Sequence, residues 1–493
     1  MIRGYSKKLG VILASIIAAG TFAACGESEV SNVSSEADTG SVFENIKDAP
    51  TEISEASESA ADEASDNVSA EENNNDNIEE ALTLGDERFE EYIPLLEGKR
   101  VALFSNQSGI VGDECSFDYD SAGDGADLIH FGKDDQGNDV TYGEHVLDAL
   151  IRQKVDVACV LSPEHGFRGT KDAGEGVDDS VDPATGVPLL SLYEENRGKA
   201  VSEDTLEKFD VLVVDIQDVG LRFYTYYITM FDLMDACADK GKPVIILDRP
   251  NPNGFLVDGP ILRDEFISNV GRLPIPVVHG MTLGELALMI NGEGWLGAGK
   301  NSCDLSVIQC LGYDHNTRHC LIKAPSPNLK DMRAVYLYPS TCLFENTVVS
   351  VGRGTENPFE TYGSPYLADM AEYDYNFTPV SMEGAISPMY QDETCYGRDL
   401  RSLSLEDIQN AGINLDYLID AYHAVTEKDI SVSFWGTKYI DGHYWIDYLM
   451  GCDTVRLQIE EGLSGQEIKA SWADELCKFK EKRREYLLYT DFE

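Results

Sequence analysis

Buried strands and amphipathic helices alternate through the first half of this chain's body. Strands are predicted where the residues are apolar throughout, at 100–104, 155–161, 211–214 and 244–247. Helices are predicted where apolar residues recur with helical spacing, at 144–154, 227–240 and 283–291. Strands without a polar face need cover on both sides, so the pattern predicts a parallel sheet between two helical layers. With right-handed crossovers, this is a doubly wound α/β domain.

The rest of the chain is expected to form a second domain, because 493 residues are too many for one ordinary core. Beyond about residue 300 the strands are shorter, and Pro, Gly and Tyr are frequent. We therefore predict a first domain at 83–300 and a smaller α+β domain at 301–493. A final amphipathic helix is expected at 468–488. The acidic, aperiodic stretch 113–139 is expected to be a surface insertion.

The first 25 residues have the pattern of a secretory signal. A basic start precedes an apolar run at 9–19, which is too short to span a membrane, and small residues lead to Cys25. This ending resembles a bacterial lipobox, which predicts that Cys25 is lipidated and anchors the protein to the cell membrane on its extracytoplasmic side. The alternative is an ordinary signal peptide with an incidental cysteine. Residues 26–82 are rich in Ser, Glu, Ala, Asp and Asn, which predicts a disordered acidic tether.

Charge and cysteine content restrict the partners and the chemistry. The net charge is -50, so we expect no nucleic-acid partner, because phosphate binding needs a surplus of Lys and Arg. An anionic ligand would need a few local arginines. Of the 11 cysteines, those other than Cys25 are even in number, which permits disulfides in an exported protein. Cys159 and Cys237 lie in apolar patterns and are expected to be buried thiols.

Polar residues follow each of the four predicted strands directly. The carboxyl ends of parallel strands share one edge of a sheet, so these loops should converge on a ligand site. The candidates are Asn106 after the first strand; Glu164, His165 and Arg168 after the second; Asp215, Gln217, Asp218, Arg222 and Tyr224 after the third; and Asp248, Arg249, Asn251 and Asn253 after the fourth.

The residue types in these loops favour carbohydrate chemistry. The G-x-G-x-x-G and Walker motifs are missing, so no nucleotide cofactor is expected, and a missing G-x-S-x-G elbow argues against a serine hydrolase. The segment 315–320 offers His and Cys without a matching carboxylate motif, so we expect no metal there. Amides and carboxylates bind sugar hydroxyls, and carboxyl pairs perform acid/base work on glycosidic bonds.

Glu164 is the predicted general acid. It follows Pro163 on a rigid turn, and a second domain that dried the site would raise its pKa. The alternative is that Glu164 caps the next helix through backbone amides. His165 either positions Glu164, contacts substrate or has a structural role.

The second carboxylate is left open among Asp215, Asp218 and Asp248. The alternative for Asp248 and Arg249 is a structural ion pair across their loop. Arg222 and Arg249 are candidate clamps for a substrate carboxylate, because a guanidinium binds carboxylates in bidentate fashion.

Several long stretches resemble the NamZ-type exo-β-N-acetylmuramidases, in one order from about residue 90 to the end. The matching stretches are S-N-Q-S-G at 105–109, P-E-H-G-F-R-G at 163–169, D-I-Q-D-V-G-L-R-F-Y-T-Y at 215–226, L-D-R-P-N-P-N-G at 247–254, H-G-M-T-L-G-E-L at 279–286, Y-P-S-T-C-L-F-E at 338–345 and G-R-G-T at 352–355.

This resemblance implies a Rossmann-like domain, a smaller C-terminal domain and a cleft between them. It implies release of N-acetylmuramic acid from the non-reducing ends of peptidoglycan fragments during cell-wall turnover, without a cofactor. Glu164 matches the family's catalytic glutamate. Arg353 and Glu356 would line the cleft from the second domain, and His279 and Glu345 are further candidates for substrate binding.

Two other functions compete with this interpretation. One is a solute-binding lipoprotein for sugars or muropeptides that performs no catalysis. The other is a different cell-wall enzyme, such as an amidase or esterase, which the missing zinc-ligand spacing and nucleophile motifs disfavour.

Overall fold

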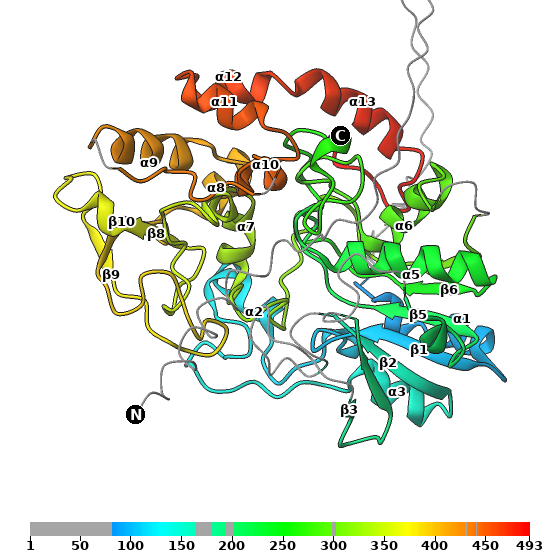
Figure 1. Ribbon diagram of the computed structural model, residues 1–493. Helices are drawn as coiled ribbons and strands as arrows, with labels where there is room; N and C mark the ends of the chain where they lie inside the picture. Colours follow the sequence, from blue (N-terminus) through cyan, green and yellow to red (C-terminus); the bar gives the residue numbers. More distant parts are fainter. Residues whose placement is uncertain are drawn as a thin grey trace, which may run out of the picture. The chain divides into compact units, whose positions relative to one another are not determined.

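Seven strands form the main sheet of the described residues, in the order β3-β4-β2-β1-β5-β6-β7 (Figure 1). Their bounds are β1 (Arg100–Ser105), β2 (Asp156–Ser162), β3 (Ser180–Val181), β4 (Pro188–Ser191), β5 (Val211–Asp215), β6 (Val244–Leu247) and β7 (Leu305–Ile308). All pairings are parallel except that of the edge strand β3 with β4. The parallel strands, numbered along the chain, are ordered 3-2-1-4-5-6, which is the Rossmann arrangement. The predicted fold class is confirmed.

This computed structural model describes residues 81–163, 167, 180–192, 201–297, 302–428, 431–439 and 441–493. The predicted signal, Cys25 and nearly all of the predicted tether lie outside these residues. So do the predicted site residues Glu164, His165 and Arg168. Within the described part of the chain, no helix has the length and apolar character needed to cross a membrane.

Helices cover both faces of the main sheet, as the apolar strands predicted. The side chains of Val101 and Leu103 pack on the face covered by α1 (Phe89–Leu96) and α3 (Val146–Arg152). Those of Ala102 and Phe104 pack on the opposite face, under α5 (Tyr226–Lys240) and α6 (Leu283–Gly292). Successive strand residues point to opposite faces, so each strand contributes to two cores.

A three-stranded antiparallel sheet, β8-β10-β9, and further helices make up the C-terminal half. The strands are β8 (Thr361–Ser364), β9 (Tyr375–Phe377) and β10 (Cys395–Asp399), and the helices are α7 (Met332–Thr341), α8 (Leu405–Ala411), α9 (Asp416–Thr426), α10 (Trp445–Met450), α11 (Thr454–Glu460), α12 (Gly465–Ala470) and α13 (Ala473–Arg483). Figure 1 shows these helices beside and above the main sheet.

Three features differ from the sequence-based expectation. The predicted helix at 468–488 is two helices, because the chain turns at Trp472, whose buried indole donates to Asp258 Oδ1 at 3.1 Å. The stretch 113–139 is partly packed rather than wholly superficial, since Tyr119 and Ala126 form a small core with Ile322. The main sheet also continues past the predicted boundary at 300, because β7 extends it.

The C-terminal tail returns to the main sheet and contacts its carboxyl edge. Tyr489 donates its hydroxyl hydrogen to Asp248 Oδ2 at 2.7 Å, and the amide of Leu488 donates to Glu285 Oε1 at 2.8 Å. All ten cysteines among the described residues are free thiols, and Cys159 and Cys237 are buried as predicted. The fold is therefore held by packing and hydrogen bonds that connect both ends of the body.

Candidate active site

The strand order places a crevice between the carboxyl ends of β1 and β5. The chain moves outward in one direction from β1 and in the other from β5, so the loops after these strands diverge. Ser105 pairs with Asp215 across the two strands. Beyond them, the amide of Gln217 donates to Ser108 Oγ at 3.0 Å. The loops after the first and third predicted strands are thus brought together, as the sequence pattern predicted.

Asp218 is a buried carboxyl group in this crevice, and one of its oxygens has no hydrogen-bond partner among the described residues. Its Oδ1 accepts a hydrogen bond from the amide of Gly220 at 2.7 Å, whereas Oδ2 has no partner among the described residues. Burial raises the pKa of Asp218 to about 7. Gly220 has φ of 75°, and a Cβ there would collide with the side chain of Asn251. The turn that holds Asp218 therefore requires glycine.

Two amide side chains after β1 also leave buried atoms without partners in the described structure. Asn106 accepts hydrogen bonds from Ser108 through Oδ1, but its Nδ2 has no partner. Gln107 donates through Nε2 to the carbonyls of Ala324 and Pro325, but its Oε1 has none. Buried polar atoms are nearly always bonded, so an unsatisfied set on adjoining loops indicates a ligand site. Gln107 lies in the S-N-Q-S-G stretch but was not among the predicted site residues.

A small cavity at the carboxyl ends of β5 and β6 adjoins these groups. Its polar lining comes from Gln217, Asp218, Arg249, Asn251 and Thr282. Gln217 donates through Nε2 to the carbonyls of Asp218 and Pro250 at 2.8 and 2.9 Å, so it connects the two loops. The predicted residues Gln217, Asp218 and Asn251 are therefore close together at this edge.

Arg249 is the centre of a buried charge cluster. Its guanidinium donates to Asp215 Oδ1 at 2.6 Å and to Asp86 Oδ2 at 2.5 Å, and Asp113 Oδ1 lies 3.5 Å from Nη1. It also donates to the carbonyl of Ile110 at 3.0 Å. The structure thus pairs Arg249 with Asp215 and Asp86 rather than with its neighbour Asp248, which was the pairing considered from sequence. Arg249 and Asp215 position the loops that follow the strands of the main sheet. Direct contact of either side chain with substrate stays a prediction.

Asp248 connects the end of β6 to α6 and to the C-terminal tail. It accepts hydrogen bonds from the Thr282 hydroxyl at 2.7 Å, from the Gly284 amide at 2.9 Å and from Tyr489. Burial raises the pKa of Asp248 to about 6. With both oxygens engaged, Asp248 is less available for catalysis than Asp218.

Arg222 and the tyrosines after it join the two halves of the chain. Arg222 is fully buried and donates to the carbonyls of Pro260, Ile275 and Leu449. The hydroxyls of Tyr224 and Tyr226 both donate to the carbonyl of Pro325, at 2.8 and 2.9 Å. These contacts are internal, so the predicted role of Arg222 as a substrate clamp has no open donor pair to support it.

The remaining predicted residues of the first half are also buried. Asn251 donates to the carbonyl of Met281, and Asn253 donates to that of Val219. His279 accepts from the Met281 amide through Nδ1, while its Nε2 has no partner in the described part of the chain. Burial lowers the pKa of His279 to about 3, so this imidazole is neutral. His315, from the segment considered for metal binding, contacts Glu285 at 3.1 Å and the carbonyl of Gly254.

The second half contributes a partly exposed arginine beside a row of aromatic rings. Glu345 Oε1 accepts from Nε and Nη2 of Arg353 at 3.0 and 2.6 Å, and the guanidinium lies over Phe359. Phe359 contacts Tyr338, whose ring lies 6.2 Å from that of Tyr224. These rings connect the loop that follows β5 to Arg353. Glu356 is solvent-exposed and lies 3.4 Å from Lys330.

Phe167 is the one described residue of the P-E-H-G-F-R-G stretch beyond Pro163. Its buried ring packs 4.8 Å from that of His145, centroid to centroid. His145 Nε2 in turn lies 2.8 Å from the carbonyl of Asn106. Phe167 therefore packs on a histidine that contacts the loop following β1.

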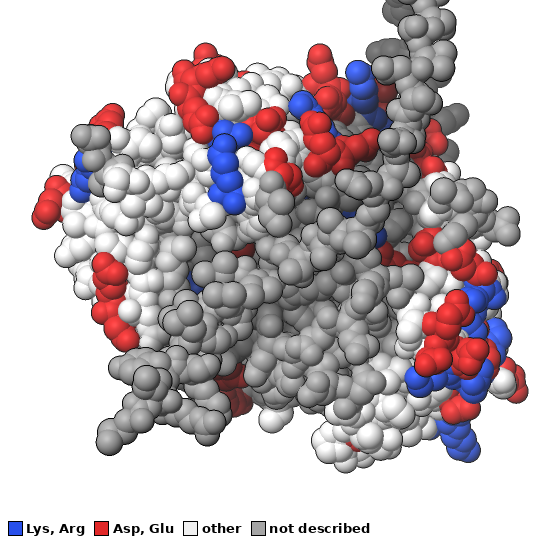
Figure 2. All heavy atoms as spheres, in the orientation of Figure 1, with Lys and Arg blue, Asp and Glu red and all other residues white. Residues whose placement is uncertain are grey.

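One face of the described surface carries both acidic and basic side chains (Figure 2). Figure 2 shows acidic side chains over several elements, with the basic ones beside them rather than gathered apart.

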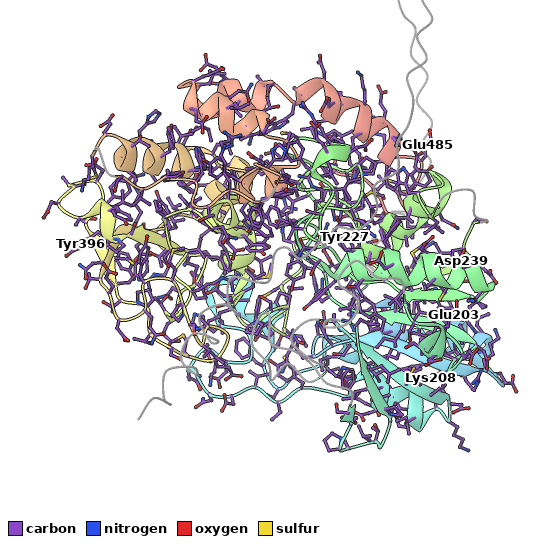
Figure 3. All side chains as sticks on the ribbon, in the orientation of Figure 1. Glu203, Lys208, Tyr227, Asp239, Tyr396 and Glu485 are labelled. Atoms are coloured by element: carbon purple, nitrogen blue, oxygen red, sulfur yellow. The ribbon has the colours of Figure 1, made fainter. Side chains whose placement is uncertain are left out.

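Figure 3 shows Tyr227 at the start of α5 and Asp239 near its other end. The hydroxyl of Tyr227 accepts from the Arg272 amide at 3.1 Å, which secures the start of α5.

Comparison with known proteins identifies the family. The models of the N-terminal and C-terminal parts of exo-β-N-acetylmuramidase NamZ match residues 136–333 and 336–489. The chain belongs to the NamZ family. It is 32% identical over 413 residues to the peptidoglycan β-N-acetylmuramidase NamZ of Bacillus subtilis (strain 168), covering 81% of this chain and 89% of that protein.

Two solved structures are similar to this NamZ family member. Both are DUF1343 family proteins from Bacteroides fragilis NCTC 9343. One is 47% identical with a TM-score of 0.70, covering 84% of this chain and all of the other. The second is 26% identical with a TM-score of 0.61, covering 83% of this chain and 99% of the other. As a NamZ family member the chain is an enzyme, a glycosidase, and the predicted resemblance is confirmed.

Proposed function

We propose that this enzyme is an exo-acting hydrolase that releases N-acetylmuramic acid from the non-reducing ends of peptidoglycan fragments during cell-wall turnover. The observation that carries the proposal is the buried carboxyl of Asp218 at the crevice of the Rossmann-like sheet. Its Oδ2 has no hydrogen-bond partner among the described residues. The Bacillus relative, whose name states action on peptidoglycan, supports the substrate class.

Most glycosidases use two carboxyl groups, one to protonate the leaving oxygen and one to activate water or act as the nucleophile. Glu164 stays the proposed general acid on the basis of its motif. Asp218 is the proposed second group, because its free Oδ2 and its pKa of about 7 suit proton exchange near neutral pH. The unsatisfied amides of Asn106 and Gln107 provide a donor and an acceptor for sugar hydroxyls or the acetamido group.

The lactyl carboxylate of N-acetylmuramic acid needs a cationic partner. Arg249 and both terminal nitrogens of Arg222 donate to groups inside the protein. Arg353 is 31% exposed, and its Nη1 makes no hydrogen bond within the described residues. We propose that Arg353 holds the lactyl group from the second half of the chain.

The decisive experiment is hydrolysis of a chromogenic N-acetylmuramic acid glycoside by wild type, Glu164→Gln, Asp218→Asn and the exposed control Glu265→Gln. Wild type and control are expected to release the chromophore, and both site variants to lose at least about 100-fold in kcat while keeping their circular dichroism spectra. An inactive wild type that binds the sugar would favour the solute-binding alternative. Activity retained in Asp218→Asn would remove Asp218 from the mechanism.

We also propose that the enzyme works outside the cell, held to the membrane by a lipid on Cys25. The support is the signal-like N-terminus and the acidic stretch that follows it. Metabolic labelling with a fatty acid analogue should mark the wild type and not Cys25→Ala. Equal labelling of the two would contradict the anchor.

A further inference from the structure

A cluster of three metal-ligating side chains lies apart from the crevice. His130, Asp331 and Glu360 each present one ligand atom, and these atoms all lie within 4.8 Å of one another. His130 belongs to the 113–139 insertion, Asp331 begins α7, and Glu360 directly precedes β8. His130 is about 200 residues from the two carboxylates, so the cluster arises only in the folded protein.

The free atoms of this cluster point to a missing ligand. Glu360 is 1% exposed, yet its Oε1 has no hydrogen-bond partner among the described residues. Asp331 uses Oδ1 to accept from the Ala334 amide at 2.9 Å, and its Oδ2 lies 3.7 Å from His130 Nε2. A buried carboxylate oxygen without a partner is costly, and a cation between the three groups would satisfy it.

The nearby arginines do not neutralise these two carboxyl groups. Arg333 lowers the pKa of Asp331 and of Glu360 only as a secondary influence, after burial raises both. Within the described residues it makes no ion pair with either. Arg401 is paired with Asp399 at 2.7 Å. Within the described part of the chain, no arginine or lysine is therefore a direct counter-charge for the carboxyl pair.

We propose that His130, Asp331 and Glu360 bind a divalent cation of the zinc class. One imidazole nitrogen and two carboxylate oxygens are ligands that Zn²⁺ accepts, with a fourth position for water. Tetrahedral bonds of about 2.1 Å separate ligand atoms by about 3.4 Å, close to the His130–Asp331 spacing of 3.7 Å. His130 is 37% exposed, which gives the ion a way in.

The bound ion braces the insertion against the second half of the chain. The Phe131 amide already donates to the Lys330 carbonyl at 2.6 Å, next to two of the three ligands. Lys330 Nζ donates to the carbonyl of Thr355, in the segment between Arg353 and Glu360. The ion thus supports the loop that carries Arg353, and its role is structural.

The test is zinc binding by the untagged full chain after chelator treatment and dialysis. Calorimetry and elemental analysis should find one tightly bound Zn²⁺ per chain, and zinc should raise Tm. His130→Ala and Glu360→Gln should each weaken binding at least about 10-fold, whereas His423→Ala, an exposed histidine on α9, should not.

Three results would overturn the site. They are no zinc retained by wild type, equal affinity in wild type and His130→Ala, or tighter binding of Ca²⁺ than of Zn²⁺. A hydrogen-bonded pair of carboxyl groups would then explain the cluster. His130→Ala alters a partly exposed side chain, so it serves as the test if Glu360→Gln fails to fold.

Discussion

Asp215 accepts two hydrogen bonds from the guanidinium of Arg249, at 2.6 and 3.2 Å, and neither side chain is appreciably exposed to solvent. The same guanidinium binds Asp86, which lies in a turn before α1. One arginine therefore joins the ends of β5 and β6 to the start of the folded body. Both groups hold the loops that form the site, and their catalytic and substrate-binding roles stay predictions.

Replacement of Arg249 by Met should destabilise the protein strongly. Asp215 and Asp86 would stay buried without their counter-charge, and breaking a buried pair in this way typically costs about 3–5 kcal/mol. Urea unfolding would measure the change. Arg100→Met, which breaks the exposed pair with Asp210, is the control and should change the midpoint little. A normal midpoint with a raised KM would instead favour a substrate clamp.

Replacement of Asp218 by Asn should stabilise the protein increasingly as pH rises from about 4 to 7. Below pH 4 the carboxyl is protonated in both the folded and unfolded states. Above it the unfolded chain ionises, while the folded-state pKa is about 7, so wild type loses stability until pH passes 7. The shift corresponds to at most about 4 kcal/mol. A Tm difference that does not vary with pH would contradict the raised pKa.

Replacement of Arg353 by Ala should raise KM for N-acetylmuramic acid glycosides by about 10- to 100-fold, with a smaller effect on kcat. The expected loss is that of a charge-assisted hydrogen bond to the lactyl carboxylate. An N-acetylglucosamine glycoside lacks this group, so its weaker hydrolysis should not change. Arg398→Ala, another partly exposed arginine of the second half, is the matched control. Equal losses on both sugars would assign Arg353 to shaping the cleft.

The sequence predicted those elements whose residues are apolar throughout. The four predicted strands are β1, β2, β5 and β6, whereas β3, β4 and β7 of the main sheet were missed. β7 is an edge strand with partly exposed residues, and β4 begins with proline, so neither has a strong apolar signal. The site could be predicted from the strand ends, because the carboxyl ends of parallel strands always lie at one edge of the sheet.

The partners of the loop residues could not be predicted in the same way. Arg249 and Asp248 are adjacent in sequence, yet Arg249 binds Asp86, 163 residues away, and Asp248 binds Tyr489, 241 residues away. His130 likewise meets Asp331 and Glu360 from about 200 residues away. Such contacts depend on the tertiary fold, and no local sequence pattern indicates them.

Replacement of His279 by Gln should make the free energy of unfolding depend less on pH below about 6.5. Burial lowers the folded-state pKa of His279 to about 3, so the imidazole stays neutral while the unfolded chain takes up a proton below about pH 6.5. Wild type therefore loses stability from this group as pH falls from about 6.5 towards 3. Urea midpoints between pH 4.5 and 7.5 should converge or cross for wild type and variant on the acid side. His423→Gln, on the surface of α9, should leave the wild-type slope unchanged. A slope equally steep in His279→Gln would show that other groups govern acid unfolding.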